Sequence, residues 1–382
     1  MRILIFTVDF PPIPGGISTY AYGITAQLNE LGEEVIVLAQ KHKESLEFDS
    51  RQKFKIVRVS NILFLREVQF FFKFIYLVRK HRIQHVLNIV WFPCAAISYF
   101  TSFLFGFSYS VVAFGAEIFD ATSLLKRTIK QHLRWLARLV FNKAVKCFPI
   151  SEFTKRFLEA RQVKSEHLLV IPGGVDIEKF GVNADCRDII DRYKLTGKKV
   201  ILTVARLDDH KGHDVVIKAL SYLLKKMADV KYLIVGDGRE RKNLEELVSR
   251  LKLEDNVIFV GHVAHEDTPP YFSLCDVFVM PSRETQGRRH WFEGFGIAYL
   301  EANACAKPVI GGLSGGVVDA VIDQETGLLV DPYDAKKLSD LIYELLTNKE
   351  HAVRLGKNGK ERVEKYFSWR ALAERIRTAI KP

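Results

Sequence analysis

Two glutamates lie eight residues apart in the segment Glu293-Gly-Phe-Gly-Ile-Ala-Tyr-Leu-Glu301. The glycines predict a turn that leads into a helix, with the main-chain amides of Phe295, Gly296 and Ile297 pointing out of the helix start. Such amides bind anions and hydroxyl oxygens, and two carboxylates at this spacing can accept hydrogen bonds from two hydroxyl-bearing parts of one ligand. Paired glutamates are often solvated surface charges. Here the neighbouring residues are largely apolar, and an idle carboxylate among them would be costly.

Three other segments carry residues that suit a phosphate-bearing ligand. Arg206 and Lys211 follow a predicted strand, and an arginine fork and a lysine point charge both bind phosphoryl oxygens. Gly212 allows the next helix to start close to a ligand. Gly236 lies at the end of the next predicted strand, and the glycine-rich stretch 311–316 follows a later one. Any one of these could be an ordinary turn, but their recurrence at successive strand ends indicates a single site.

Buried strands are expected to alternate with helices along the whole chain, which predicts an α/β fold with parallel sheets and ligands at the carboxyl ends of the strands. The strands expected in the first half are 2–8, 35–38, 55–59, 84–90, 109–114, 146–150 and 167–171. Those expected in the second half are 199–204, 231–236, 256–260, 277–280, 308–310 and 327–330, with helices over 214–227, 239–251 and much of 335–380. The composition changes between 172 and 186, so we expect two Rossmann-like domains facing a central cleft, one over 1–180 and one over 187–367.

The first strand ends in Asp9-Phe-Pro-Pro-Ile-Pro-Gly15-Gly16, and a helical pattern follows over 17–31. Strand, glycine loop and helix are the phosphate-binding opening of a doubly wound domain. Gly15 and Gly16 are therefore candidate ligand-binding residues. A tight turn that only needs glycine explains them equally well.

The 382 residues are 48% hydrophobic, enough to bury the cores of two domains. The five cysteines are scattered and form no Cys-x-x-Cys pair, which argues against a zinc site and for a reducing compartment. No secretory signal and no run of eighteen apolar residues is evident. We therefore expect a cytoplasmic protein.

The net charge of +11 lies almost entirely in the first half of the chain. Residues 1–180 carry 24 Lys and Arg against 15 Asp and Glu, whereas the remainder carries 32 against 30. No nucleic-acid-binding motif accompanies this excess, so we expect no nucleic-acid partner. An anionic membrane surface or an anionic ligand fits better.

Two segments of the first half combine cations with aromatic residues. The segment 64–77 contains four phenylalanines around position 72 beside Arg66 and Lys73, and 124–146 contains seven Lys and Arg, no acid, and Trp135. A basic amphipathic helix with aromatics can lie on anionic lipid. An ordinary helix that faces a core and solvates its basic side is the alternative.

Together, Arg206, Lys211, the pair Glu293 and Glu301 and the later glycine turn resemble the retaining GT-B glycosyltransferases of family 4, a group related to glycogen synthase and the phosphatidylinositol mannosyltransferases. The resemblance covers essentially the whole chain. It implies a GT-B fold in which Arg206 and Lys211 hold the donor diphosphate, Glu301 binds the ribose hydroxyls and Glu293 holds the transferred sugar. Glu293, Arg206 and Lys211 are thus the implied catalytic residues.

The resemblance assigns further roles in the donor site. The amides of Phe295, Gly296 and Ile297 would assist Glu293 in holding the sugar, and Gly15 and Gly16 would close over the donor phosphate. The family uses no divalent metal, because arginine and lysine neutralise the leaving diphosphate. The C-terminal helix, 368–382, is expected to pack back on the first domain, as in relatives.

The chain departs from the family pattern in one place. Many relatives carry a histidine that reaches the primary hydroxyl of the sugar, and the matching stretch here is Phe114-Gly-Ala-Glu117, with Phe114 in the histidine position. Ser151 begins a segment that also resembles one facing the cleft in the family. The basic insert 283–291, which includes His290, could cover the donor or contact an anionic acceptor, or it could be a solvated loop.

The implied activity is transfer of a sugar from a UDP- or GDP-linked donor to an acceptor hydroxyl with retention of configuration, in cell-surface polysaccharide or glycolipid synthesis. The family's usual account is front-side attack with the leaving diphosphate as base, so no protein nucleophile and no cofactor are expected. Expected partners are the donor, a lipid-linked or glycan acceptor, and an anionic membrane surface at which the protein would be peripheral. Two alternatives stay open: a non-catalytic sugar-nucleotide-binding protein, and a GT-B sugar-nucleotide epimerase.

Overall fold

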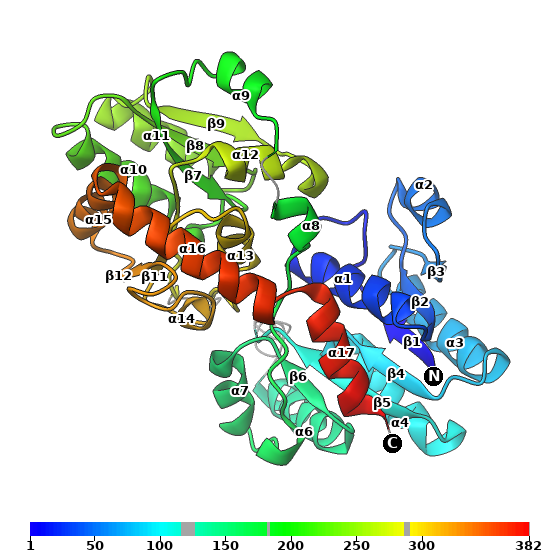
Figure 1. Cartoon of the computed structure of the whole chain (residues 1–382). Coiled ribbons are helices and arrows are strands. Elements are labelled where there is room, and N and C mark those ends of the chain that lie inside the picture. Colours follow the sequence, from blue (N-terminus) through cyan, green and yellow to red (C-terminus); the bar gives the residue numbers. More distant parts are fainter. Residues whose placement is uncertain (116–126, 182–183, 286–290, 382) are drawn as a thin grey trace. The chain divides into compact units, whose positions relative to one another are not determined.

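The computed structural model describes residues 1–115, 127–181, 184–285 and 291–381 of the chain (Figure 1). The chain forms two compact units. Unit 1 consists of Met1–Gly174 and Trp369–Pro382, and unit 2 consists of Val175–Ser368. Each unit is built around one six-stranded sheet.

The sheet of unit 1 is parallel throughout, with strand order β3-β2-β1-β4-β5-β6. The strands are β1 Arg2–Phe6, β2 Glu34–Gln40, β3 Lys55–Val59, β4 His85–Asn88, β5 Ser108–Ala113 and β6 Cys147–Pro149. The central strands are buried almost without interruption. Their near-continuous apolar runs are typical of a parallel sheet covered on both faces.

The helices of unit 1 are α1 Gly16–Glu30, α2 Ser45–Ser50, α3 Leu65–Lys80, α4 Ala96–Phe105, α6 Arg127–Lys143, α7 Glu152–Glu159 and α17 Trp369–Ile380, with short turns η1 Trp91–Ala95 and η2 Ser165–His167. Buried residues of α3, η1 and α6 share one hydrophobic cluster with β1, β2, β4 and β5. These helices therefore form one layer over one face of the sheet.

The helix α17 packs on α1, and the two run side by side in Figure 1. Its anchor is Trp369, which is buried and lies edge-on to the ring of Tyr20 with 5.8 Å between centroids. A Cβ atom at Gly23 or Gly174 would overlap the indole ring. The indole thus packs against two positions that lack side chains, far apart in sequence.

The sheet of unit 2 has the order β12-β11-β10-β7-β8-β9 and is also parallel. The strands are β7 Lys199–Val204, β8 Val230–Val235, β9 Val257–Gly261, β10 Val277–Met280, β11 Val309–Gly312 and β12 Leu328–Val330. The helices are α8 Ile177–Phe180, α9 Arg187–Arg192, α10 His213–Leu223, α11 Arg241–Leu251, α12 Pro269–Leu274, α13 Ile297–Ala304, α14 Val317–Ala320, α15 Ala335–Thr347 and α16 Lys349–Tyr366, with turns η3 Asp209–Lys211 and η4 His265–Asp267.

The predicted α/β fold with two parallel, helix-flanked sheets is confirmed. The prediction of a strand over 167–171 is wrong. Leu169 and Ile171 donate main-chain hydrogen bonds to Cys147 and Pro149 of β6, but only one isolated bridge forms, between Leu168 and Cys147. The edge strand β6 is three residues long and ends in a proline, so it offers few ladder positions.

The basic aromatic segments of the first half are helices α3 and α6. Among the residues that the structure describes, no helix combines the length and the apolarity needed to cross a bilayer.

Candidate functional site

Most of the predicted donor-binding residues of unit 2 follow the carboxyl ends of four neighbouring strands, β11, β10, β7 and β8. Arg206 and Lys211 come after β7, Gly236 after β8 and Glu293 after β10, and the glycine stretch begins in β11 and continues to Gly316. This edge is where ligands bind in open parallel sheets. The fold therefore brings together segments that lie more than one hundred residues apart along the chain.

Lys211 and Glu293 form the centre of the site. Lys211 ends the turn η3, and its Nζ donates to Oε2 of Glu293 at 2.5 Å. The exposed fractions of the two side chains are only 16% and 13%. Burial alone would raise the pKa of the Glu293 carboxyl, but the charge and hydrogen bond of Lys211 hold this pKa below its usual value. The pair is therefore a charged, largely desolvated couple.

The turn that carries Glu293 is shaped by glycine. Gly296 has a φ of +96° and precedes α13, and a Cβ atom there would lie 2.5 Å from the ring of Tyr299. A side chain is therefore excluded by conformation and by space. The main-chain amide of Phe295 also helps to lower the pKa of the Glu293 carboxyl. One of the three amides predicted to face a ligand therefore acts on the glutamate as well.

The glycine-rich stretch after β11 packs directly on this turn. The amide of Gly316 donates to the carbonyl oxygen of Glu293 at 2.8 Å. A Cβ atom at Gly315 would lie 2.7 Å from the same oxygen, and one at Gly316 would overlap the carbonyl of Gly294. These glycines therefore serve the close approach of two main-chain segments.

Arg206 belongs to a cluster with two partners that the sequence did not indicate. Its guanidinium pairs with Oδ2 of Asp208 at 3.0 Å, and Arg239 pairs with the other oxygen of Asp208 at 3.3 Å. The side chain of Arg206 is 68% exposed, whereas that of Asp208 is 14% exposed. Two arginines thus share the carboxylate of Asp208, and Arg239 also lies 4.0 Å from a carboxylate oxygen of Glu240.

A histidine and a tryptophan lie beside the central pair. The ring of His210 stacks on Trp291, with 6.0 Å between centroids and an interplanar angle of 13°. Burial, together with the charge of Lys211, lowers the pKa of His210 to about 4. His210 is therefore neutral at physiological pH. The guanidinium of Arg239 lies 5.9 Å from the Trp291 ring.

Glu301 lies one turn inside α13 and is nearly buried. Its Oε1 is 2.7 Å from Nε2 of His265, in the turn η4. Burial opposes the charged form of His265, but the hydrogen bond and charge of Glu301 dominate and raise the pKa of this histidine. Its ring also contacts Phe180, with 5.6 Å between centroids. The carboxylate predicted to bind ribose is thus oriented by a histidine.

Gly236 has a packing role. Its φ is +137°, and a Cβ atom there would overlap the carbonyl oxygen of Ala205. The loops after β7 and β8 therefore touch through their main chains. This close contact holds the segment of Arg206 against the neighbouring strand end.

The candidates Gly15, Gly16, Phe114 and Ser151 belong to unit 1. Gly15 has a φ of +140° and precedes α1, and a Cβ atom at either Gly15 or Gly16 would meet nothing within 4 Å. Phe114 lies edge-on to the buried Tyr20, with 5.4 Å between centroids. The Ser151 hydroxyl accepts a hydrogen bond from the Thr154 amide at 3.0 Å and caps α7. The candidates Glu117 and His290 lie outside the described residues.

Sequence reasoning missed Asp208, His210, Arg239 and His265. Asp208 and His210 lie between Arg206 and Lys211 in the sequence. Their position between two predicted phosphate-binding residues was a signal that could have identified them. His265 had no comparable signal, because its partner Glu301 is 36 residues away and no motif joins them.

The described site of unit 2 combines three cations, Arg206, Arg239 and Lys211, with the carboxylates of Asp208 and Glu293. The clustered cations suit an anionic ligand, and Glu301 adds an acceptor for hydroxyl donors. The arrangement suits a ligand with phosphate and polyol parts.

Comparison with protein families gives two matches that together span most of the chain. The model described as Glycosyltransferase Family 4 matches residues 14–179, and the model described as Glycosyl transferases group 1 matches residues 187–362.

Similar curated proteins cover nearly the full length. The GDP-mannose-dependent alpha-(1-6)-phosphatidylinositol monomannoside mannosyltransferase of Mycolicibacterium smegmatis is 30% identical, over 98% of this chain and 97% of its own. The GDP-mannose-dependent monoacylated alpha-(1-6)-phosphatidylinositol monomannoside mannosyltransferase of Corynebacterium glutamicum is 29% identical, over 100% of this chain and 98% of its own.

Solved structures share the fold. HepE of Anabaena in complex with UDP has a TM-score of 0.82 and 18% identity, over 100% of this chain and 99% of its own. Sucrose-phosphate synthase of Thermosynechococcus elongatus has a TM-score of 0.80 and 24% identity, over 99% of this chain and 98% of its own.

Proposed function

The chain belongs to the family 4 glycosyltransferases of GT-B fold, and we propose that it transfers mannose from GDP-mannose to a hydroxyl of a glycolipid acceptor. Full-length relatives named as GDP-mannose-dependent mannosyltransferases of phosphatidylinositol mannosides support this choice of donor and acceptor. Glycosyl transfer from a nucleotide sugar is the broader activity, and mannose, GDP and the glycolipid are the specific parts of the proposal.

The observation that carries the donor assignment is the buried Lys211–Glu293 pair at the carboxyl edge of the sheet, with Glu301 on the helix that follows Glu293. In this proposal Lys211 and Arg206 contact the donor diphosphate, and Glu301 accepts hydrogen bonds from the ribose hydroxyls. Glu293 accepts hydrogen bonds from sugar hydroxyls, since its carboxylate stays ionised beside Lys211.

The reaction is proposed to retain configuration and to need no metal ion. As the bond from the sugar to the diphosphate breaks, negative charge develops on the leaving phosphate. In this proposal Arg206 and Lys211 stabilise that charge. Lys211 lies in a largely desolvated position, where a fixed cation interacts more strongly than it does in water. The acceptor hydroxyl would pass its proton to the leaving diphosphate.

The first experiment combines thermal shift with a transfer assay. GDP and GDP-mannose should raise the melting temperature of the wild-type chain, since a ligand that binds only the folded state stabilises it. UDP, UDP-glucose and EDTA serve as comparisons for the base, the sugar and the metal. Glu301→Ala should abolish the shift, and Glu364→Ala, an exposed glutamate on α16, is the matched control.

Transfer of labelled mannose to a phosphatidylinositol-containing acceptor tests the activity itself. Arg206→Ala and Lys211→Ala should lower kcat more than they weaken nucleoside binding, because the charge they meet develops in the transition state. GDP-mannose binding without transfer or hydrolysis would contradict the proposal and favour a binding protein. Conversion of the donor to an epimer would favour an epimerase.

The glycolipid acceptor implies an anionic membrane surface as a partner, at which the protein would be peripheral on the cytoplasmic side. In unit 1, α4 packs against both α3 and α6 (Figure 1). These three helices expose large apolar side chains to solvent, namely Phe71, Phe72, Tyr76, Phe100, Phe103, Leu104 and Trp135. Cations accompany them, since Lys143 lies 5.5 Å from the Phe103 ring and Arg79 5.0 Å from the Phe105 ring. Aromatics beside cations suit the headgroup region of an anionic bilayer.

Co-sedimentation with vesicles tests this partner. The wild-type chain should bind vesicles that contain phosphatidylglycerol, bind less as salt rises, and bind neutral vesicles weakly. The triple variant Phe72→Ser, Phe103→Ser, Trp135→Ser should lose binding. Tyr222→Ser, which removes an exposed aromatic side chain from unit 2, should not. Equal binding by both variants would contradict the membrane contact.

A further inference from the structure

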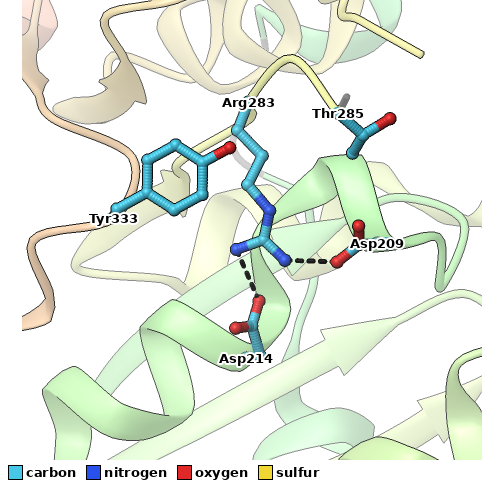
Figure 2. A pocket seen from close by; sticks show the side chains of 5 residues that line it. All are labelled: Asp209, Asp214, Arg283, Thr285 and Tyr333. Atoms are coloured by element: carbon cyan, nitrogen blue, oxygen red, sulfur yellow. Dashed lines mark hydrogen bonds and ion pairs between the residues drawn. The ribbon is translucent and has the colours of Figure 1, made fainter. Parts of the chain in front are cut away.

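Arg283 is a buried cation to which the proposed donor site gives no role. It follows β10, is 8% exposed, and places its guanidinium between two carboxylates (Figure 2). One amino group pairs with Asp209 and the other pairs with Asp214 at 3.0 Å. A buried guanidinium is stable only with such partners.

The two carboxylates lie on either side of Lys211 along the chain. Asp209 begins the turn η3 that Lys211 ends, and Asp214 lies in the first turn of α10, which follows at once. The main-chain amide of Arg283 also donates to the carbonyl oxygen of His210 at 2.8 Å. One residue therefore holds the lysine-bearing turn at two points and the start of α10 at a third.

The geometry needs an arginine. Its planar fork presents two separate amino groups, so one side chain can reach two carboxylates on different elements, which a lysine ammonium cannot do with the same fixed angles. The Tyr333 ring lies 5.5 Å from the guanidinium, and its hydroxyl donates to the carbonyl oxygen of Glu284 at 3.1 Å. A pocket of about 510 Å³ is lined by Asp209, Asp214, Arg283, Thr285 and Tyr333 (Figure 2).

The same segment leads on to Thr285. The main chain of Thr285 pairs with that of Trp291, and Trp291 stacks on His210. The sequence next reaches Glu293, the partner of Lys211. Arg283 thus ties together the two chain segments that supply the central ion pair.

We propose that Arg283 is a positioning residue that holds Lys211 in register with Glu293 and with the donor diphosphate. This inference rests on the proposed function, because Lys211 matters to catalysis only if it meets that phosphate. Arg283 itself would touch no substrate atom. Its effect on nucleotide binding should therefore pass through Lys211.

A double-mutant cycle tests this dependence, with isothermal titration of GDP into the millimolar range. In the wild-type background Arg283→Lys should weaken GDP binding about tenfold, which is within the range of coupling for neighbouring groups. In a background of Lys211→Met with Glu293→Gln, the same change should cost less than about twofold. A residue that only stabilises the fold would cost the same in both backgrounds, and that result would overturn the proposal.

Two further variants make the outcome decisive. Asp214→Asn removes one of the two carboxylate partners of Arg283. It should weaken GDP binding in the wild-type background by less than Arg283→Lys does, and have still less effect in the double-variant background. The test therefore stands even if Arg283→Lys fails to fold. Arg377→Lys is the stability control, because it alters an arginine paired with the buried Glu33 in unit 1. It should lower the melting temperature and leave GDP affinity unchanged. If the wild-type chain binds neither GDP nor GDP-mannose, the proposed function fails and this inference fails with it. If it binds GDP but the two backgrounds respond equally, only the inference fails.

Discussion

The charged residues of the site form ion pairs and hydrogen bonds with one another. Lys211 pairs with Glu293, Arg206 with Asp208, and Glu301 with His265. Donor binding must therefore share or exchange these contacts. A carboxylate oxygen has more than one acceptor position, so Glu301 can keep the histidine and still accept a ribose hydroxyl.

The central pair makes a prediction about stability. Lys211→Met alone leaves Glu293 charged in a nearly closed site, and the free energy of unfolding should fall by about 3 kcal/mol. Adding Glu293→Gln removes the unpaired charge and should restore more than half of that loss. Urea unfolding of the two single variants and the double variant measures the coupling. Strict additivity of the two changes would contradict a buried, coupled pair.

The sequence predicted the kinds of residue at the site better than their partners. Glu293, Lys211 and Arg206 stood out because each lies in a local segment with a recognisable pattern. The pairs Lys211–Glu293 and Glu301–His265 join residues 82 and 36 positions apart, and such contacts depend on the strand order of the sheet. No local spacing carries that information, so His265 and Arg239 were missed.

At the scale of elements, glycines set the distance between the loops that carry the site. A side chain at Gly316 would overlap the carbonyl of Gly294, whereas one at Gly16 would meet nothing within 4 Å. Both glycines lie at the start of a helix, and neither has a left-handed φ, so they form a matched pair.

Gly316→Ala should therefore destabilise unit 2 by about 2 kcal/mol, as expected for an overpacked site. Gly16→Ala should leave the free energy of unfolding within about 0.5 kcal/mol of wild type, because no atom has to move. Thermal and urea unfolding of the two variants check this contrast. A Gly316→Ala protein as stable as wild type would mean that the loops separate at no cost.

Most strands were predictable because continuous apolar runs and breakers alternate along the chain. The failure at 167–171 shows the limit of that signal. An apolar segment at the edge of a sheet packs on the core whether or not it pairs as a strand. Whether it pairs depends on the length and register of the neighbouring strand. Here the neighbour β6 offers three residues, ending in Pro149.

At the scale of the whole molecule, three buried histidines make the fold sensitive to acid. Burial lowers the pKa of His85 to about 3, and burial is likewise the largest cause that lowers the pKa of His210 and His213 to about 4. The unfolded chain takes up protons near pH 6.5, where the folded chain does not. The free energy of unfolding should therefore fall as the pH drops from about 6.5 to about 4.

Each histidine can contribute up to about 1.4 kcal/mol per pH unit within that window. Urea unfolding at half-unit steps between pH 7.5 and 4.5 measures the slope. His213→Gln should reduce the slope by close to one proton, and an exposed control, His262→Gln, should not. A flat profile over this range would show that these histidines are charged in the folded chain.

The docking of α17 on α1 has a consequence for how the chain is made. The ribosome synthesises α1 early and α17 only after the whole of unit 2, yet both helices belong to unit 1. During translation the surface around Gly23 and Gly174 is therefore not yet covered by the indole of Trp369, which packs on it in the folded protein. Unit 2 can complete its fold first, while the earlier-made unit 1 stays unfinished until α17 leaves the exit tunnel. Until then this part of unit 1 is exposed to solvent in the nascent chain.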